Sequence, residues 1–237
     1  RKYLDFLFEE GIIETDLGEV LPMILPRIPN SYPLPSVYTD EEIRAILGSI
    51  DRSTVQGSRD FAILLLASSL GIRASDICEM TLEAINFVKN ELCFIQKKTS
   101  VPLTLPLLPD VKEALLGYLG CRKINSTDEP IFIQCRAPYH KLTRMGIWTI
   151  MRRYLKQSGV DPGHRKRGTH ALRSSLASSM VREQVPYYAV QKILGHESPQ
   201  STKNYVRIDI GRLREFTLPV PEAYGRFDAF LKGGETR

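Results

Sequence analysis

Two polar residues three positions apart predict a binding site for phosphate. In the segment HALR, His170 and Arg173 project from the same side of a helix, because residues i and i+3 are neighbours there. A guanidinium can bind two phosphate oxygens at once, and an imidazole can exchange a proton near neutral pH. Such pairs are common, and His170 alone is better interpreted as a capping or hydrogen-bonded core histidine. The pair is more informative here because it follows the basic run at 165–167 at the start of a helix, where anions bind favourably.

A second candidate group combines a glycine, a histidine and a tyrosine. Gly195 ends an apolar helical segment, His196 falls in the following turn, and Tyr205 lies in the next expected helix, which opens at 198–199. A phenol has a pKa of about 10, so it becomes a nucleophile only where a base or a cationic site favours phenolate. The chain has 10 tyrosines, and composition alone does not distinguish Tyr205 from those that pack.

Two further groups place cations after a helix and on a turn. Arg73 follows the helix-ending Gly71, and Asp76 is close enough in sequence to orient its guanidinium. The alternative is a surface Arg–Asp pair, which contributes little to stability. Lys97 and Lys98 lie at the tip between two expected strands, where a lysine can reach a ligand or can simply be exposed.

Charge is distributed unevenly along the chain. Residues 1–60 hold 6 basic and 11 acidic side chains, whereas residues 136–173 hold 10 basic side chains and one acidic side chain. An excess of this size attracts a polyanion, although a solvated helix face is the alternative. The candidate DNA-binding residues in this stretch are Lys141, Arg144, Arg165, Lys166 and Arg167.

The expected fold is α+β and mainly α-helical, with a small three-stranded antiparallel sheet. The helices expected from periodicity and caps span residues 39–47, 58–70, 74–80, 109–119, 143–157, 169–182 and 187–194. The strands are expected at residues 86–88, 92–96 and 101–107. In this arrangement each of the four candidate groups lies at the end of an expected helix or in an expected turn.

The ends of the chain differ from its centre. Residues 1–14 predict the end of a helix closed by Gly11, which we interpret as the last helix of a domain lying mostly upstream. Five prolines between residues 15 and 38 predict an extended linker. Beyond Pro219, an apolar stripe at helical spacing predicts a short C-terminal helix over residues 221–237.

Several classes of protein are not favoured by the sequence. The longest apolar runs, such as 62–67, are far too short to span a bilayer, and no leader peptide is visible, so we expect a cytoplasmic protein without a membrane partner. The four cysteines show no CxxC or CxH spacing, so we expect reduced thiols and no zinc site. These cysteines are Cys78, Cys93, Cys121 and Cys135.

Taken together, the four groups resemble the tyrosine recombinases, or phage-type integrases. The family pattern is GxRxxD, a β-turn lysine, HxxR, LGH and a tyrosine nine residues later. The corresponding segments here are GIRASD (71–76), QKKTS (96–100), HALR (170–173) and LGHESPQSTKNY (194–205). Five motifs in this order are a strong signal, and the resemblance extends over about residues 37–210.

The resemblance implies a site that binds a scissile DNA phosphate. Arg73 and Arg173 would hold the non-bridging oxygens and stabilise the charge of the pentavalent transition state. His196 would donate a hydrogen bond to the phosphate, and Asp76 would hold Arg73 in place.

The resemblance also implies how the strand is cut. Tyr205 would attack phosphorus to form a 3′-phosphotyrosyl bond, His170 would accept its proton, and Lys98 would protonate the leaving 5′ oxygen. Lys98 is preferred to Lys97 because the family commonly has a Lys-Thr pair. Because the covalent bond conserves the phosphodiester energy, no metal and no other cofactor are expected.

The implied organisation has three parts and several partners. Residues 1–36 would be the end of an upstream helical DNA-binding domain plus the linker, residues 37–220 the catalytic domain, and residues 221–237 a tail that neighbouring protomers exchange. The implied partners are double-stranded DNA, further copies in a tetramer on DNA, and an accessory directionality factor. The expected setting is the nucleoid of a bacterium or a phage-infected cell.

Three other activities are compatible with parts of this pattern. A type IB topoisomerase shares the chemistry but does not exchange strands, and the apolar tail argues against it. A non-catalytic DNA-binding regulator would use only the basic stretch. A metal-dependent nuclease is the least favoured.

Overall fold

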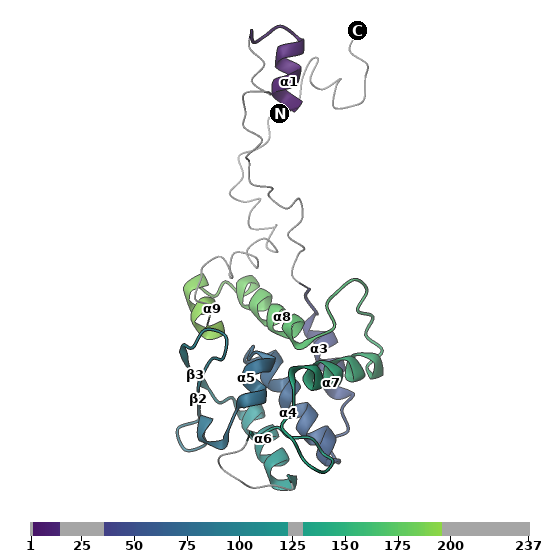
Figure 1. Cartoon of the computed structure of the whole chain (residues 1–237), viewed down its shortest axis with the longest axis vertical. Helices are drawn as coiled ribbons and strands as arrows, with labels where there is room; N and C mark the ends of the chain where they lie inside the picture. The colour runs from purple at the N-terminus through teal and green to yellow at the C-terminus, as the bar shows by residue number, and fades with distance from the viewer. Residues whose placement is uncertain (1, 15–35, 123–129, 196–237) are drawn as a thin grey trace. The chain divides into compact units, whose positions relative to one another are not determined.

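The 237-residue chain is described by a computed structural model, shown in Figure 1. The structure describes residues 2–14, 36–122 and 130–195. His196, Tyr205, most of the expected linker and the expected C-terminal helix therefore lie outside the described residues. Within the described ranges, no helix combines the length and the apolar character needed to cross a bilayer.

The chain divides into two units, Arg1–Leu34 and Pro35–Arg237. In the first unit the described residues form helix α1 (Lys2–Glu9). Gly11 follows it with a φ of 66°, a left-handed conformation that suits glycine and ends the helix as expected.

In its described residues the second unit is mainly helical and carries one small sheet, so the expected fold class is confirmed. Its helices are α3 (Asp40–Gly48), α4 (Val55–Ser69), α5 (Ala74–Glu79), the 3₁₀ helix η1 (Leu82–Ala84), α6 (Pro109–Cys121), α7 (Arg144–Gln157), α8 (Thr169–Arg182) and α9 (Tyr187–Leu194). The strands β1 (Ile85–Asn86), β2 (Glu91–Ile95) and β3 (Pro102–Pro106) are antiparallel in the order β1-β2-β3. The expected strands are shifted by one or two residues at their ends.

Side-chain caps explain where several of these helices begin. Thr39 and Glu42 form the expected capping box of α3, and Thr143 accepts a hydrogen bond from Gly146 N (3.1 Å) at the start of α7. Helix α4 starts three residues before the expected position, because the Thr54 hydroxyl accepts a hydrogen bond from Gly57 N (3.0 Å).

Helix α4 is the centre of the core. Its side chains are buried on almost all sides, which is why its sequence is apolar without a strong helical stripe. It packs against α3, α5, α6, α7 and α8. The sheet covers one flank, and the start of α5, the β2–β3 turn, α8 and α9 lie near one another on that side of the unit (Figure 1).

A buried ion pair on α4 fixes neighbouring elements. Arg59 Nη2 lies 2.6 Å from Asp60 Oδ1, and Tyr154 of α7 donates its hydroxyl hydrogen to Asp60 Oδ2 (3.1 Å). Burial raises the pKa of Asp60, while the adjacent Arg59 opposes that rise. Arg59 also donates to Ile133 O (2.8 Å), so α4 holds both α7 and the segment that leads to Lys141.

Candidate active site

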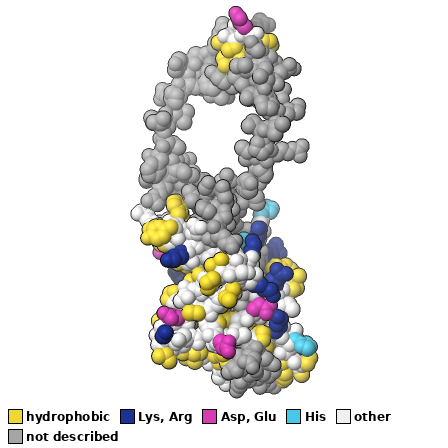
Figure 2. Space-filling view, turned by 60° about the vertical axis from the view of Figure 1, so that its left-hand side comes forward, with side chains coloured by type: hydrophobic (Ala, Val, Ile, Leu, Met, Phe, Trp, Pro, Cys, Tyr) yellow, Lys and Arg dark blue, Asp and Glu magenta, His cyan; other side chains and the backbone are white. Residues whose placement is uncertain are grey.

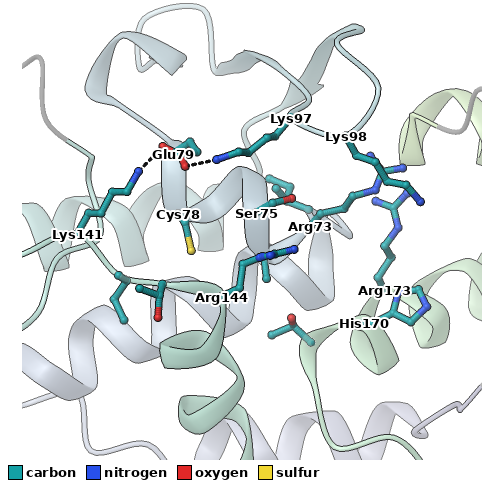
Figure 3. A pocket seen from close by; sticks show the side chains of 15 residues that line it. Arg73, Ser75, Cys78, Glu79, Lys97, Lys98, Lys141, Arg144, His170 and Arg173 are labelled. Atoms are coloured by element: carbon teal, nitrogen blue, oxygen red, sulfur yellow. Dashed lines mark hydrogen bonds and ion pairs between the residues drawn. The ribbon is translucent and has the colours of Figure 1, made fainter.

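A pocket of about 900 Å³ opens where α5, the β2–β3 turn, the start of α7 and α8 meet (Figure 3). Its lining is strongly cationic and includes Arg73, Lys97, Lys98, Lys141, Arg144, His170 and Arg173. Glu79 is the only acidic residue among the described residues that line it. A pocket with this lining suits an anion such as a phosphodiester that belongs to a polyanionic chain.

Arg73 enters the pocket from a tight turn between α4 and α5. It is the N-cap residue of α5 and follows Gly71, whose φ is 63°. Its Nη2 donates to Gly195 O (3.2 Å), whereas its buried Nη1 has no hydrogen-bond partner among the described residues. A buried donor without a partner is costly, so this nitrogen is well placed to bind an oxyanion.

Arg173 connects three elements from the second turn of α8. It is only 4% exposed. Its Nη1 donates to Gly71 O (2.5 Å) and its Nη2 to Leu194 O (2.6 Å). The guanidinium therefore joins the α4–α5 turn to the end of α9, and Figure 3 shows it beside the guanidinium of Arg73.

Gln96 links the lysine turn to the end of α9, a contact that the sequence analysis did not single out, although the residue begins the QKKTS segment. Its side chain is 1% exposed, donates to Leu194 O (3.3 Å) and accepts from Thr99 Oγ1 (2.9 Å). A Cβ at Gly195 would collide with the Gln96 amide group, so the glycine is required for this close approach. The sequence feature that could have pointed to Gln96 is its position as a polar residue at the end of an apolar strand.

Asp76 supports the lysine turn rather than Arg73. Its Oδ1 accepts hydrogen bonds from Lys97 N (3.0 Å) and Ser75 Oγ (3.3 Å). In the described part of the chain the Asp76 carboxylate forms neither a hydrogen bond nor an ion pair with the Arg73 guanidinium, although the Asp76 backbone N–H donates to Arg73 O (2.9 Å). The expectation that this carboxylate orients the Arg73 guanidinium is therefore corrected, because the carboxylate bonds Ser75 and the β2–β3 turn.

The two adjacent lysines point in different directions. Lys97 Nζ lies 2.6 Å from Glu79 Oε1 on α5. Lys98 instead extends toward Arg73 and Arg173 (Figure 3). Of the two, Lys98 is thus the lysine that reaches the arginines, which agrees with the preference based on the Lys-Thr pair.

His170 lies beside Arg173 at the start of α8 (Figure 3). His170 is exposed, but the neighbouring residues of the pocket displace part of the water around its imidazole ring. This desolvation lowers the pKa of the imidazole, and the positive charges of Lys166, Arg173, Arg73 and Lys98 lower it further. The neutral imidazole, which can accept a proton, is therefore favoured near pH 7.

The candidate DNA-binding residues have different surroundings. Lys141 Nζ lies 2.8 Å from Glu79 Oε2, and Arg144 is exposed and points into the pocket (Figure 3). Lys166 and Arg167 are exposed in the loop before α8, where their side chains can reach a ligand from solvent.

Arg165, one of the expected DNA-binding residues, is held by partners within the protein. Its guanidinium forms two hydrogen bonds with Glu42, 2.6 Å from Nη1 to Oε2 and 2.8 Å from Nη2 to Oε1. It also donates to Val37 O (3.2 Å) and to Asp161 O, and it covers the ring of Tyr38 at 4.3 Å. Because these partners occupy its donors, Arg165 anchors residues 37–42 to the loop before α8.

All four cysteines are free thiols in the structure. Cys78 lines the pocket, but burial raises its pKa to about 11. A thiol with this pKa is protonated near neutral pH and is a poor nucleophile. The described residues contain no group of three His, Cys, Asp or Glu side chains that could hold a metal ion.

The fold and the cationic pocket define a class of proteins. Residues 36–212 match the model of the phage integrase family. The chain belongs to this family, the tyrosine recombinases. The resemblance inferred from the five motifs is therefore confirmed.

Two curated relatives come from Sinorhizobium fredii. The putative integrase/recombinase y4gC is 34% identical over 189 residues, which cover 79% of this chain and 97% of that protein. The putative integrase/recombinase y4rA is 31% identical over 222 residues, which cover 93% of this chain. The chain spans only 53% of the length of y4rA.

The fold is also shared with a solved recombinase structure. The XerH site-specific recombinase bound to palindromic difH substrate superposes with a TM-score of 0.66 and 22% identity. The match covers 77% of this chain and 52% of the XerH chain. At this identity the likeness establishes the common fold.

Proposed function

We propose that this chain is the catalytic part of a site-specific DNA recombinase that cuts and rejoins strands through a 3′-phosphotyrosyl intermediate. The observation that carries the proposal is the convergence of Arg73, Lys98, His170 and Arg173 on one pocket, with a buried Nη1 of Arg73 that lacks a partner among the described residues. Its substrate is double-stranded DNA, and its biological role is the integration, excision or resolution of mobile elements.

The arginines bind the scissile phosphate. Arg73 donates its unpaired Nη1 to a non-bridging oxygen, which satisfies a buried donor and stabilises the charge of the transition state. Arg173 contributes positive charge beside it and holds the turn that carries Arg73. His196 donates a further hydrogen bond to the phosphate.

The cleavage step exchanges one ester for another. The Tyr205 oxygen forms a bond to phosphorus while the bond to the 5′ oxygen breaks. His170 accepts the phenol proton, and Lys98 donates a proton to the leaving 5′ oxygen. Ligation reverses each transfer, so the number of phosphodiester bonds and the protonation state of the protein are restored without a metal or another cofactor.

The remaining parts of the chain hold DNA and other protomers. Lys141, Arg144, Lys166 and Arg167 contact the phosphate backbone around the pocket. Residues 1–36 end an upstream helical DNA-binding domain with its linker, residues 37–220 form the catalytic domain, and residues 221–237 form the exchanged tail.

Catalysis takes place in a larger assembly. Four copies assemble on two DNA duplexes, an accessory factor sets the direction of recombination, and the complex works on the nucleoid of a bacterium or on phage DNA. Exchange of the tail from one protomer to the next links the four copies.

A nicked suicide substrate tests the proposed chemistry. The wild-type chain should form a covalent protein–DNA adduct that is resistant to chelators, whereas Tyr205→Phe should form none and still bind DNA, because only the nucleophilic oxygen is removed. The adduct is measured by denaturing gel electrophoresis. An adduct at normal yield with Tyr205→Phe would refute the assignment of the nucleophile.

The same assay separates the alternative activities. A regulator forms no adduct, a metal-dependent nuclease loses cleavage with chelator, and a topoisomerase forms no Holliday junction from two duplexes. Holliday junctions from paired sites would support strand exchange.

A further inference from the structure

The adjacent lysines of the β2–β3 turn raise the question of what selects one of them for the pocket. Lys97 and Lys98 have the same side chain and the same charge, so their chemistry does not distinguish them. They differ in their partners, because Lys97 Nζ lies 2.6 Å from Glu79 Oε1, while Lys98 extends toward the arginines (Figure 3). The selection must come from residues that hold the turn.

Helix α5 holds Lys97 at two points. Asp76 Oδ1 accepts a hydrogen bond from the backbone N–H of Lys97 (3.0 Å), and Glu79 binds its ammonium group. The preceding residue, Gln96, is also fixed, since it is buried and donates to Leu194 O (3.3 Å). With the backbone and side chain of Lys97 held, the direction of Lys98 is restricted as well.

Glu79 is an unusual residue for the wall of a DNA-binding pocket. A carboxylate repels phosphate, and Glu79 is the only acid among the described lining residues. Its two oxygens bind Lys97 (2.6 Å) and Lys141 (2.8 Å), which join α5 to the turn and to the segment before α7. Hydrogen bonds from Lys141 and then Lys97 lower the pKa of Glu79, so both ion pairs persist at neutral pH.

We propose that Glu79 is a positioning residue that holds Lys97 against α5 and thereby directs Lys98 to the leaving 5′ oxygen. The inference rests on the proposed function, which gives Lys98 the role of proton donor. Glu79 acts through the two lysines and does not touch the reacting atoms, so it is not a catalytic residue.

The expected effect is confined to protonation of the leaving group. The Lys97–Glu79 pair is exposed, with side-chain exposures of 60% and 37%, so its loss should leave the fold intact. Exposed pairs are weak, and we expect about a three- to fivefold loss of cleavage rate when this pair is removed. An effect on binding or on general structure would not be specific to the leaving group.

A substrate with sulfur in place of the 5′-bridging oxygen isolates this step. A thiolate is a much better leaving group than an alkoxide, so its departure needs no proton donor. Single-turnover cleavage of both substrates is measured at saturating protein, which removes differences in affinity. Glu79→Gln should cut the oxygen substrate about three- to fivefold more slowly than wild type and the sulfur substrate at the wild-type rate.

Two variants of the same surface make the comparison specific. Lys97→Ala should reproduce the effect of Glu79→Gln, and the double variant should be no slower than either single variant, because both remove one interaction. Glu83→Gln removes a nearby exposed carboxylate that is not among the residues lining the cationic pocket and should match wild type on both substrates. If Glu79→Gln slows cleavage of neither substrate, or slows cleavage of both equally, the ratio of the two rates stays at its wild-type value and the proposal is overturned.

Lys98→Ala separates this proposal from the proposed function. It should lose cleavage of the oxygen substrate and recover it with sulfur. If sulfur does not rescue Lys98→Ala, the proton-donor role fails and the positioning role of Glu79 fails with it. If sulfur rescues Lys98→Ala while Glu79→Gln behaves as wild type on both substrates, only the positioning role is refuted.

Discussion

The two arginines of the pocket differ in how their donors are used. Arg173 Nη1 and Nη2 donate to Gly71 O and Leu194 O, so this residue contributes to the packing of three elements. Arg73 keeps a buried Nη1 without a partner among the described residues. The structure thus separates an arginine whose terminal nitrogens stabilise the fold from one that keeps a buried donor without a partner among the described residues.

Replacement of either arginine should separate these roles. Arg73→Ala should lower the cleavage rate by about 10²- to 10³-fold with little change in stability, because it removes a preorganised donor. Arg173→Ala should also lower the free energy of unfolding by about 1–3 kcal/mol, since two buried carbonyls lose a donor. Suicide-substrate kinetics and urea unfolding measure the two effects. Equal losses of rate and of DNA affinity would instead indicate that Arg73 only holds the DNA backbone.

His170 should make stability depend on pH. Desolvation and the nearby cations lower its folded pKa below 6.5, so between these values the unfolded chain binds more protons than the folded chain. The free energy of unfolding should therefore rise with pH through this window and fall as the pH drops through the folded pKa. Urea unfolding at several pH values measures the slope, which His170→Gln should reduce. An equal slope in that variant would show that other groups cause it.

At the scale of elements, the turn between α4 and α5 depends on Gly71. Its φ of 63° suits glycine, and an added Cβ would lie 2.7 Å from Leu194 Cδ2 and 3.2 Å from Leu176 Cδ2. The close approach of α8 and α9 to this turn brings Arg73 and Arg173 together. The geometry of the pocket is therefore sensitive to a single methyl group outside it.

Gly71→Ala should destabilise the chain and reduce cleavage. The left-handed conformation alone costs about 1–2 kcal/mol for a residue with a Cβ, and displacement of Leu194 adds to this. Gly120→Ala is the matched control, because no atom lies within 4 Å of a Cβ built at this position in the last turn of α6, and alanine has a higher helix propensity than glycine. Thermal or urea unfolding compares the two. Equal stability of both variants would contradict the packing argument.

At the scale of the whole molecule, the basic side chains of residues 136–173 fall into two groups, those bound within the protein and those exposed to solvent. Figure 2 shows Lys and Arg side chains gathered along one edge of the surface. Arg165 is bound to Glu42 and anchors residues 37–42 at the loop before α8, whereas Lys166 and Arg167 are exposed. Only the exposed residues are expected to release counterions on binding DNA.

The salt dependence of DNA binding tests this division. Lys166→Glu with Arg167→Glu should flatten the plot of log affinity against log salt, by about 0.9 for each phosphate that the protein no longer neutralises. Lys89→Glu, an exposed charge reversal in the β1–β2 turn, should leave the slope unchanged. Arg165→Ala should instead lower stability, because it leaves Glu42 without its partner. A slope near zero in the unmodified chain would contradict DNA binding by this surface.

The sequence by itself determined the family, the fold class and most element boundaries. These depend on local information: helix caps such as Thr39 and Thr143, helix-ending glycines such as Gly195, and residue periodicity. The motifs are local as well, since each spans only a few residues. Their order identified the candidate catalytic residues, including His196 and Tyr205, which lie outside the described residues.

Only the tertiary structure decided which partner each polar side chain binds. Arg165 belongs to a basic run, but its partner Glu42 is 123 residues away. Gln96 binds Leu194 O across 98 residues, and Asp76 faces the lysine turn instead of Arg73. Such contacts depend on how elements far apart in the sequence pack together. Local sequence patterns therefore do not predict which distant residue a side chain contacts.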